Sequence, residues 1–265
     1  MASGLTTISS NKIDQRFERL HHAGRKALVC YVTAGHPDRT RSLDLIKGLE
    51  DEGADIIEIG VPFSDPIADG PVIQQSSQEA LAAGMSLDGA LRLVEEARLE
   101  IPVVLFSYLN PLLAAGEDVL SRAHNSGVDG VLVTDLPVGA DQERESWLGS
   151  SDLAYIRLVA PTTPLERMKE IARNGSGFVY LISRLGVTGA QAALSPDLAA
   201  TAARLREATE LPICIGFGLS RPEQARAASA VADGVVVGSA IVQAAATRLD
   251  AAFSLVRSIR HALDS

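Results

Sequence analysis

The length, composition and charge of this 265-residue chain are those of a globular protein. Hydrophobic residues make up 46% and charged residues 22%, so the chain can bury enough apolar surface to offset its ordering entropy, which excludes wholesale disorder. The net charge of −9 disfavours nucleic acid and anionic membranes as partners, because both are negatively charged. We expect one domain over residues 1–265, since α/β barrels commonly reach about 250 residues.

The sequence also indicates a cytoplasmic protein. Its longest apolar stretches, such as 101–106, are far shorter than the roughly 20 residues needed to cross a bilayer. Residues 1–10 lack both a cationic start and a long apolar middle, so we expect no secretion signal there. Cys30 and Cys214 each lie in an apolar run, which favours buried free thiols over a disulfide.

Eight short runs rich in Val and Ile predict strands. They span residues 27–32, 55–59, 102–106, 130–134, 154–159, 178–182, 212–216 and 234–237. Between them, apolar residues recur every three or four positions, as at Leu43, Ile46 and Leu49, which is typical of amphipathic helices. A further helix is predicted before the first strand, near 13–22. Strands that alternate with helices predict a parallel sheet.

This order of elements favours a closed (β/α)₈ barrel, a TIM barrel with an extra N-terminal helix, over an open doubly wound sheet. A weak repeat supports the barrel, because Asp55, Asp129 and Asp233 each precede a buried run after a helix that ends at a small residue. In such barrels the active site lies at the C-terminal strand ends and in the loops that follow, whereas the opposite face serves stability.

Glu58 is the strongest candidate for a catalytic residue. It interrupts the isoleucines of the second predicted strand, and the alternation of a strand directs it opposite to Ile57 and Ile59, into the barrel. A buried carboxylate costs several kcal/mol unless it is paired or protonated, so Glu58 has either a structural partner or a function. Burial would raise its pKa toward neutrality, as a general acid/base requires.

The positions of lysine and histidine disfavour two kinds of barrel chemistry, the Schiff-base and the metal-assisted aldolase mechanisms. A Schiff base needs a lysine at the barrel mouth, yet the four lysines fall in predicted helices or before the first strand: Lys12, Lys26, Lys47 and Lys169. A metal centre needs several converging ligands, yet of the five histidines only His36 falls in a mouth loop. We therefore expect neither a Schiff base nor a metal.

Two loops at the predicted mouth carry further candidates. The active-site loop, about residues 60–71, contains Asp65 and Asp69, which by themselves are ordinary turn residues but follow Glu58 closely. The loop at about 183–195 is long, and we interpret it as a lid, because such loops are uncommon unless functional or disordered. Tyr180 should face inward beneath it, either as a barrel-filling aromatic or as a substrate contact.

Glycines after the seventh and eighth predicted strands indicate a phosphate site. One group lies at 216–220, and Gly238 and Ser239 stand just before a helical pattern. Glycines allow backbone N–H groups to approach an anion, and a helix N-terminus adds a favourable dipole. Either group alone is a weak signal, but together, after these two strands, they favour phosphate.

Taken together, these residues resemble the alpha chain of tryptophan synthase. Residues 57–71 match the family signature Leu-Glu-x-Gly-x-Pro-[Phe/Tyr]-Ser-Asp-Pro-x-Ala-Asp-Gly-Pro, with Ile57 at the first position. The resemblance continues in order over nearly the whole chain, at 33–35, 108–111, 135–137, 183–189, 216–218 and 238–239. The sequence departs from the family pattern at His36 and Leu109.

The resemblance implies a lyase of tryptophan biosynthesis that cleaves indole-3-glycerol phosphate to indole and glyceraldehyde 3-phosphate by acid/base retro-aldol chemistry. Glu58 would protonate the indole ring carbon and help to deprotonate the glycerol hydroxyl. Asp69 would stay ionised and hold the indole N–H, and Thr188 would hydrogen-bond Asp69 on lid closure. The implied substrate-binding residues are Tyr31, Tyr108, Tyr180, Thr188 and Phe217, and the implied phosphate-binding residues are Gly189, Gly218, Gly238 and Ser239.

The resemblance further implies no cofactor in this chain and a beta chain as partner, in an alpha2beta2 complex whose beta chain carries pyridoxal phosphate and receives the indole. Asp65 and Pro66 match positions that the family places at that interface. The alternatives are a stand-alone lyase that releases indole, another phosphosugar-binding barrel enzyme, and a non-catalytic partner of the beta chain. The presence of both Glu58 and Asp69 argues against the last of these.

Overall fold

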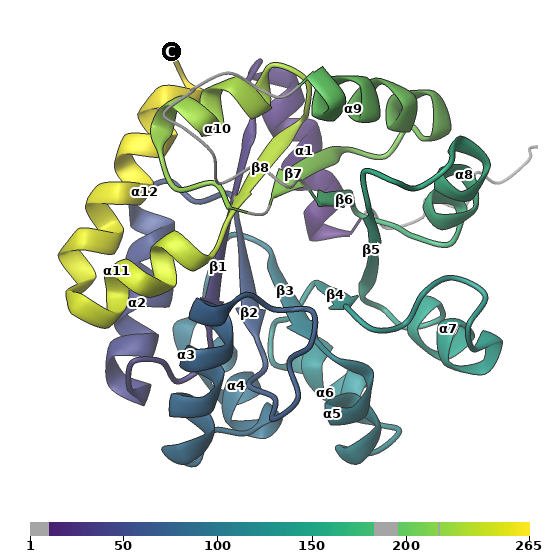
Figure 1. The fold of residues 1–265 in the computed structure, drawn as a ribbon. Coiled ribbons are helices and arrows are strands. Elements are labelled where there is room, and N and C mark those ends of the chain that lie inside the picture. The colour runs from purple at the N-terminus through teal and green to yellow at the C-terminus, as the bar shows by residue number, and fades with distance from the viewer. Residues whose placement is uncertain (1–10, 183–195, 217) are drawn as a thin grey trace, which may run out of the picture.

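Parallel strands close into a barrel in the order of the sequence. The computed structural model describes residues 11–182, 196–216 and 218–265, and within these ranges eight strands pair from β1 to β8, with β8 returning to β1. Helices surround the strands (Figure 1). The predicted (β/α)₈ barrel is therefore confirmed, and each predicted strand end agrees with the structure to within one residue.

The strands are β1 (Ala27–Thr33), β2 (Ile56–Gly60), β3 (Val103–Ser107), β4 (Gly130–Val133), β5 (Ala154–Val159), β6 (Val179–Ile182), β7 (Ile213–Gly216) and β8 (Gly234–Val237). The helices are α1 (Lys12–His22), α2 (Arg39–Asp51), α3 (Pro71–Ala82), α4 (Leu87–Ala97), α5 (Leu109–Ala114), α6 (Val119–Asn125), α7 (Gln142–Gly149), α8 (Leu165–Arg173), α9 (Pro196–Ala208), α10 (Pro222–Ser229), α11 (Ser239–Thr247) and α12 (Leu249–Leu263). The long connection between β2 and β3 holds two helices, α3 and α4.

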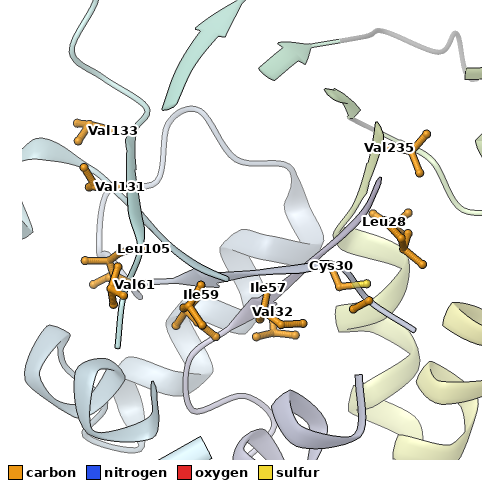
Figure 2. Close-up of a cluster of buried hydrophobic side chains, with 14 of the residues drawn as sticks. Leu28, Cys30, Val32, Ile57, Ile59, Val61, Leu105, Val131, Val133 and Val235 are labelled. Carbon is orange, nitrogen blue, oxygen red and sulfur yellow. The ribbon is translucent and has the colours of Figure 1, made fainter. Parts of the chain in front are cut away.

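Alternation along the strands divides the apolar core into an outer and an inner part. Outward side chains, such as those of Cys30, Ile57 and Ile59, pack against the surrounding helices (Figure 2). Inward side chains fill the barrel, and helix α1 closes its N-terminal end, where Phe17 contacts Phe178 with ring centroids 5.8 Å apart. A ligand therefore reaches the barrel interior from the C-terminal end.

The repeated aspartates hold the N-terminal end of the barrel together. Asp55, Asp129 and Asp233 each accept a hydrogen bond of 2.8 or 2.9 Å from a backbone N–H of a neighbouring strand. The donors are, in the same order, Leu28, Val103 and Ile213. The side chains thus satisfy strand-end N–H groups that have no ladder partner. The three repeated aspartates therefore lie at the N-terminal face of the barrel, which serves stability rather than catalysis.

Two simpler predictions are also confirmed. Cys30 and Cys214 are both free and buried. Helix α1 begins at Lys12, one residue before the predicted start.

In the part of the chain that the structure describes, no helix has both the length and the apolar character needed to span a membrane.

Candidate active site

A cavity of about 290 Å³ lies at the C-terminal end of the barrel, and both predicted catalytic carboxylates line it. Glu58 comes from β2, and Asp69 comes from the loop between β2 and α3. The described residues around the cavity are Tyr31, Glu58, Ala68, Asp69, Gly70, Ile73, Phe106, Thr134, Leu158, Tyr180, Ile182, Gly218, Val236, Gly238 and Ser239. The fold therefore brings together side chains that are far apart in the sequence.

Glu58 is buried in the barrel wall, with 1% of its surface exposed. It pairs with Tyr31 of β1 and Val104 of β3 in the strand register. Its Oε1 atom is buried and has no hydrogen-bond partner among the described residues. Because burial disfavours the charged form, the pKa of Glu58 rises to about 8. The structural-partner interpretation of Glu58 thus finds no support in the described residues, and a carboxyl group that keeps its proton at neutral pH faces the cavity.

Tyr31 lies beside Glu58 in the strand register, and its ring reaches over Gly60 of β2. A Cβ atom built on Gly60 would be 2.0 Å from the Tyr31 hydroxyl oxygen, so the missing side chain of Gly60 makes room for this hydroxyl. The ring of Phe106 packs edge-on against Tyr31, with centroids 5.2 Å apart. The family resemblance implies that Tyr31 binds the substrate, and the structure places its hydroxyl at Gly60, two residues beyond Glu58 along β2.

Asp69 is held by Tyr108. The Tyr108 hydroxyl donates to Oδ2 of Asp69 across 3.0 Å and accepts from the backbone N–H of Ala68 at 2.9 Å. Burial raises the pKa of Asp69 to about 6, and the hydrogen bond from Tyr108 opposes part of this rise. Asp69 is therefore mostly ionised at neutral pH. Tyr108, predicted as a substrate contact, does not itself line the cavity that the described residues form.

The two carboxyl groups thus differ in charge near pH 7. The pKa of Glu58 is about 8 and that of Asp69 is about 6, each raised chiefly by burial. At a pH between these values Glu58 is a proton donor while Asp69 is an anion. Two acidic groups whose environments separate their pKa values in this way are typical of paired acid and electrostatic roles.

The part of the cavity wall that follows β7 and β8 is suited to an anion. Gly218 follows β7 with a φ of +82°, a conformation that L side chains rarely adopt. Gly238 is the N-cap of α11, and Ser239 is the first residue of that helix. The first N–H groups of a helix have no intrahelical partner, and its dipole favours negative charge. All three residues line the cavity, as the phosphate prediction requires.

Apolar side chains from strands β3, β5, β6 and β8 and from helix α3 complete the cavity wall. They are Ile73, Phe106, Leu158, Ile182 and Val236. Sequence reasoning did not single them out, although the alternation that directed Glu58 and Tyr180 inward also applies to Phe106 and Leu158. Tyr180 lines the cavity as predicted, and a Cβ on Gly216 would lie 2.3 Å from its hydroxyl oxygen.

Several predicted residues fall elsewhere. Thr188 and Gly189 in the predicted lid, and Phe217 after β7, lie outside the described residues. His36 is buried near the mouth, with Nδ1 3.2 Å from Oε2 of Glu79 on α3, and it does not line the cavity.

The placement of the lysines follows the prediction. All four lie in helices or before β1: Lys12 in α1, Lys26, Lys47 in α2 and Lys169 in α8. No lysine is among the described residues of the cavity wall. In the described ranges no three His, Cys or carboxylate side chains are grouped closely enough to hold a metal ion.

The fold is that of the (β/α)₈-barrel class, and its cavity combines two carboxyl groups, apolar side chains and a helix N-terminus suited to an anion. Comparisons specify the family. The family model for the tryptophan synthase alpha chain matches residues 17–262. A tryptophan synthase alpha chain of Desulfatibacillum aliphaticivorans is 49% identical over 235 residues, which cover 86% of this chain and 87% of the relative.

Two further relatives cover almost the whole chain. A tryptophan synthase alpha chain of Laribacter hongkongensis is 46% identical over 263 residues, covering 96% of this chain and 100% of the relative. The crystal structure of tryptophan synthase subunit alpha from Legionella pneumophila strain Paris is 35% identical, with a TM-score of 0.88 and coverage of 97% and 99%. This chain belongs to the tryptophan synthase alpha chain family.

Members of this family cleave indole-3-glycerol phosphate to indole in tryptophan biosynthesis, and the chain is accordingly a lyase. The family forms a complex with a beta chain. The alpha chain itself needs no cofactor, because pyridoxal phosphate belongs to the beta chain. The resemblance found in the sequence is thus confirmed at the level of family, reaction and partner.

Proposed function

We propose that Glu58 and Asp69 together carry out the cleavage of indole-3-glycerol phosphate in this chain, in the cytoplasm. The observation that carries this proposal is the meeting of the two carboxyl groups in one cavity, with Oε1 of Glu58 buried there and without a hydrogen-bond partner among the described residues. A buried polar atom without a partner is costly, so it is retained where a substrate or a reaction uses it.

Glu58 first acts as an acid. Its raised pKa keeps it protonated at neutral pH, and it donates that proton to the ring carbon that bears the glycerol chain. The ring then becomes an electron sink with positive charge on its nitrogen. The Glu58 carboxylate next takes the proton of the hydroxyl on the adjacent chain carbon. That carbon becomes an aldehyde, the carbon–carbon bond breaks toward the ring, and Glu58 ends protonated by the hydroxyl's proton while its first proton stays on the ring carbon of indole.

Asp69 stabilises the charge that forms between these two proton transfers. As an anion held by Tyr108, it accepts a hydrogen bond from the indole N–H while the ring nitrogen is positive. This stabilisation is greatest in the intermediate and in the transition states beside it, so it lowers the barrier as well as binding the substrate.

The phosphate end fixes the substrate in position. We assign the phosphate to Gly218, Gly238 and Ser239, which line the cavity on the side of the α11 N-terminus. Tyr31 and Tyr180 border the ring between the two ends. Acid/base help contributes about 10²–10⁴ in rate, so anchoring and water exclusion must supply the rest. Thr188, Gly189 and Phe217 keep the roles that the family resemblance implies.

Two near-isosteric substitutions test the proposal. Glu58→Gln and Asp69→Asn are each expected to abolish cleavage of indole-3-glycerol phosphate while the circular dichroism spectrum stays that of the wild type. Glu96→Gln on α4 is the control, because Glu96 lies on the surface and pairs there with Arg39. Wild-type turnover in either cavity variant would refute the assigned roles.

The same assay separates the alternatives that the sequence left open. The purified chain is mixed with indole-3-glycerol phosphate alone and together with a beta chain. Turnover that depends on the beta chain supports a synthase subunit, whereas strong turnover by the chain alone supports a stand-alone lyase. An isomerase would consume a phosphosugar without releasing indole.

A further inference from the structure

The loop that carries Asp69 has one face toward the cavity and one face away from it. Ala68 and Asp69 line the cavity. Pro66 and Ile67 instead line a separate hollow on the surface, together with Gln74 of α3. The side chain of Gln74 is exposed, and the proposed reaction does not use it.

The side-chain amide of Gln74 joins two points of this loop. Its Nε2 atom donates to the carbonyl oxygen of Asp69 at 3.0 Å and to that of Pro66 at 3.3 Å. An amide nitrogen carries two protons, so it can serve both acceptors at once. The Pro66 oxygen also accepts from the backbone N–H of Asp69 at 3.0 Å, which closes a turn over residues 66–69. Gln74 therefore bridges the carbonyl groups at the two ends of this turn.

The helix that carries Gln74 is itself fixed to the barrel. The hydroxyl of Ser76 donates to the carbonyl oxygen of Ile73 at 2.9 Å, so the Thr33 hydroxyl at the end of β1 donates to Ser76 across 2.7 Å. Thr33 and Ser76 are each 1% exposed. Ile73 also lines the cavity. Gln74 thus holds the loop to a helix whose place relative to the cavity is set by buried contacts.

Tyr108 holds the same loop from the barrel side. Its hydroxyl accepts from the Ala68 N–H and donates to the Asp69 carboxylate. Asp69 therefore has its carboxylate bonded to Tyr108, its N–H bonded to Pro66 and its carbonyl bonded to Gln74. Removal of the Gln74 amide would release the turn from α3 on the side away from the cavity.

We propose that Gln74 is a positioning residue for the cleavage reaction, whose side-chain amide holds the turn at 66–69 so that the Asp69 carboxylate meets the indole N–H. This inference rests on the proposed function, in which Asp69 stabilises the positive ring. Gln74 is not among the described residues of the cavity wall. It acts through the backbone of the loop.

A displaced Asp69 carboxylate should affect the transition state more than substrate binding. Its interaction with the indole N–H is strongest when the ring is positive, whereas the phosphate end anchors the substrate in every state. A misplacement of about 1 Å can cost on the order of 10²-fold in rate. We therefore expect kcat to fall about tenfold to hundredfold, with KM little changed, when the amide donors are removed.

Three variants test this inference in the complex, at saturating beta chain because Pro66 matches a position at the expected interface. Gln74→Met has nearly the same length without a donor and should show the fall in kcat. Gln74→Lys keeps N–H donors at nearly the same reach and should recover most of the wild-type kcat. Gln75→Met is the matched control on the same helix, because the Gln75 amide is exposed and donates to Oε1 of Glu79 at 2.9 Å. Its kcat should remain that of the wild type.

Urea unfolding separates positioning from stability. Surface substitutions change stability little, so the unfolding midpoint of Gln74→Met should stay close to that of the wild type. A lower midpoint with an unchanged kcat would mean a purely structural role and would overturn the inference. Equal falls in kcat for Gln74→Met and Gln75→Met, or no recovery in Gln74→Lys, would overturn it as well. If Gln74→Met fails to fold, Gln74→Glu replaces it, because it keeps the shape, has no N–H donor and should show the same fall.

Asp69→Asn separates a failure of this inference from a failure of the proposed function. Inactive Asp69→Asn with a wild-type kcat in Gln74→Met overturns the inference and leaves the proposed function standing. Active Asp69→Asn overturns both.

Discussion

The hydroxyl of Tyr31 occupies the space that a side chain at Gly60 would fill. A Cβ atom on Gly60 would lie 2.0 Å from the Tyr31 hydroxyl oxygen and 2.5 Å from Cζ of the same ring. Glu58 and Gly60 are two residues apart on one strand and so face the same side. The glycine of the signature segment is therefore what allows the Tyr31 ring to lie over β2, two residues beyond Glu58.

This relationship predicts a strong coupling between positions 31 and 60. Gly60→Ala is expected to destabilise the fold by about 1–3 kcal/mol, since the added methyl group must displace a ring packed against Phe106. The loss should shrink when Tyr31→Leu removes the ring. Urea unfolding of the two single variants and the double variant measures the coupling, and additive losses would contradict the shared-space explanation.

Glu58 should reduce the stability of the fold at alkaline pH. Burial raises its pKa from 4.5 to about 8, so the folded chain binds a proton that the unfolded chain has released between these values, and stability falls as pH rises through them. Glu58→Gln does not titrate there. We expect the variant to gain on the order of a few kcal/mol over the wild type by about pH 9 and almost nothing at about pH 4. Denaturant unfolding across this range tests the prediction, and a gap that is constant with pH would exclude it.

Tyr108→Phe should move the lower limb of the kcat/KM profile upward. The hydrogen bond from Tyr108 lowers the pKa of Asp69 against the larger effect of burial, so its removal lets that pKa rise above about 6. The variant should lose most activity near pH 6 and less near pH 8, where Asp69 is ionised in both proteins. The pH dependence of indole release measures this difference. A uniform loss at every pH would instead indicate that Tyr108 acts only on the shape of the loop.

The strands and the inward direction of Glu58 could be predicted because both depend on local alternation, which is visible in a single sequence. The glycines that we assign to the phosphate could be located because they follow β7 and β8, and Gly218 and Gly238 do line the cavity. The role of Tyr108 was not visible, since it depends on the loop of Asp69 folding back over the end of β3, a contact between residues 39 apart in the sequence. Thr134, which follows β4 and lines the cavity, could have been found by the barrel rule.

The N-terminal end of the barrel should carry stability and leave catalysis unchanged. Arg260 on α12 and Asp55 form an ion pair of 2.9 Å, with side chains 9% and 1% exposed, and Asp55 also binds Arg16 at 2.6 Å. Breaking a buried pair costs roughly 3–5 kcal/mol, and Arg16 should keep the loss in Arg260→Met toward the lower value.

Arg257→Met is the matched control on the same helix. Its side chain is 65% exposed and pairs with Glu52, and exposed pairs contribute about 0–1 kcal/mol. Thermal and urea unfolding should therefore separate the two variants, while kcat and KM of both remain those of the wild type, because the cavity lies at the opposite end of the strands. Similar destabilisation by both substitutions would show that the Asp55 network is no stronger than a surface pair, and a fall in kcat for Arg260→Met would show that the two ends of the barrel are coupled.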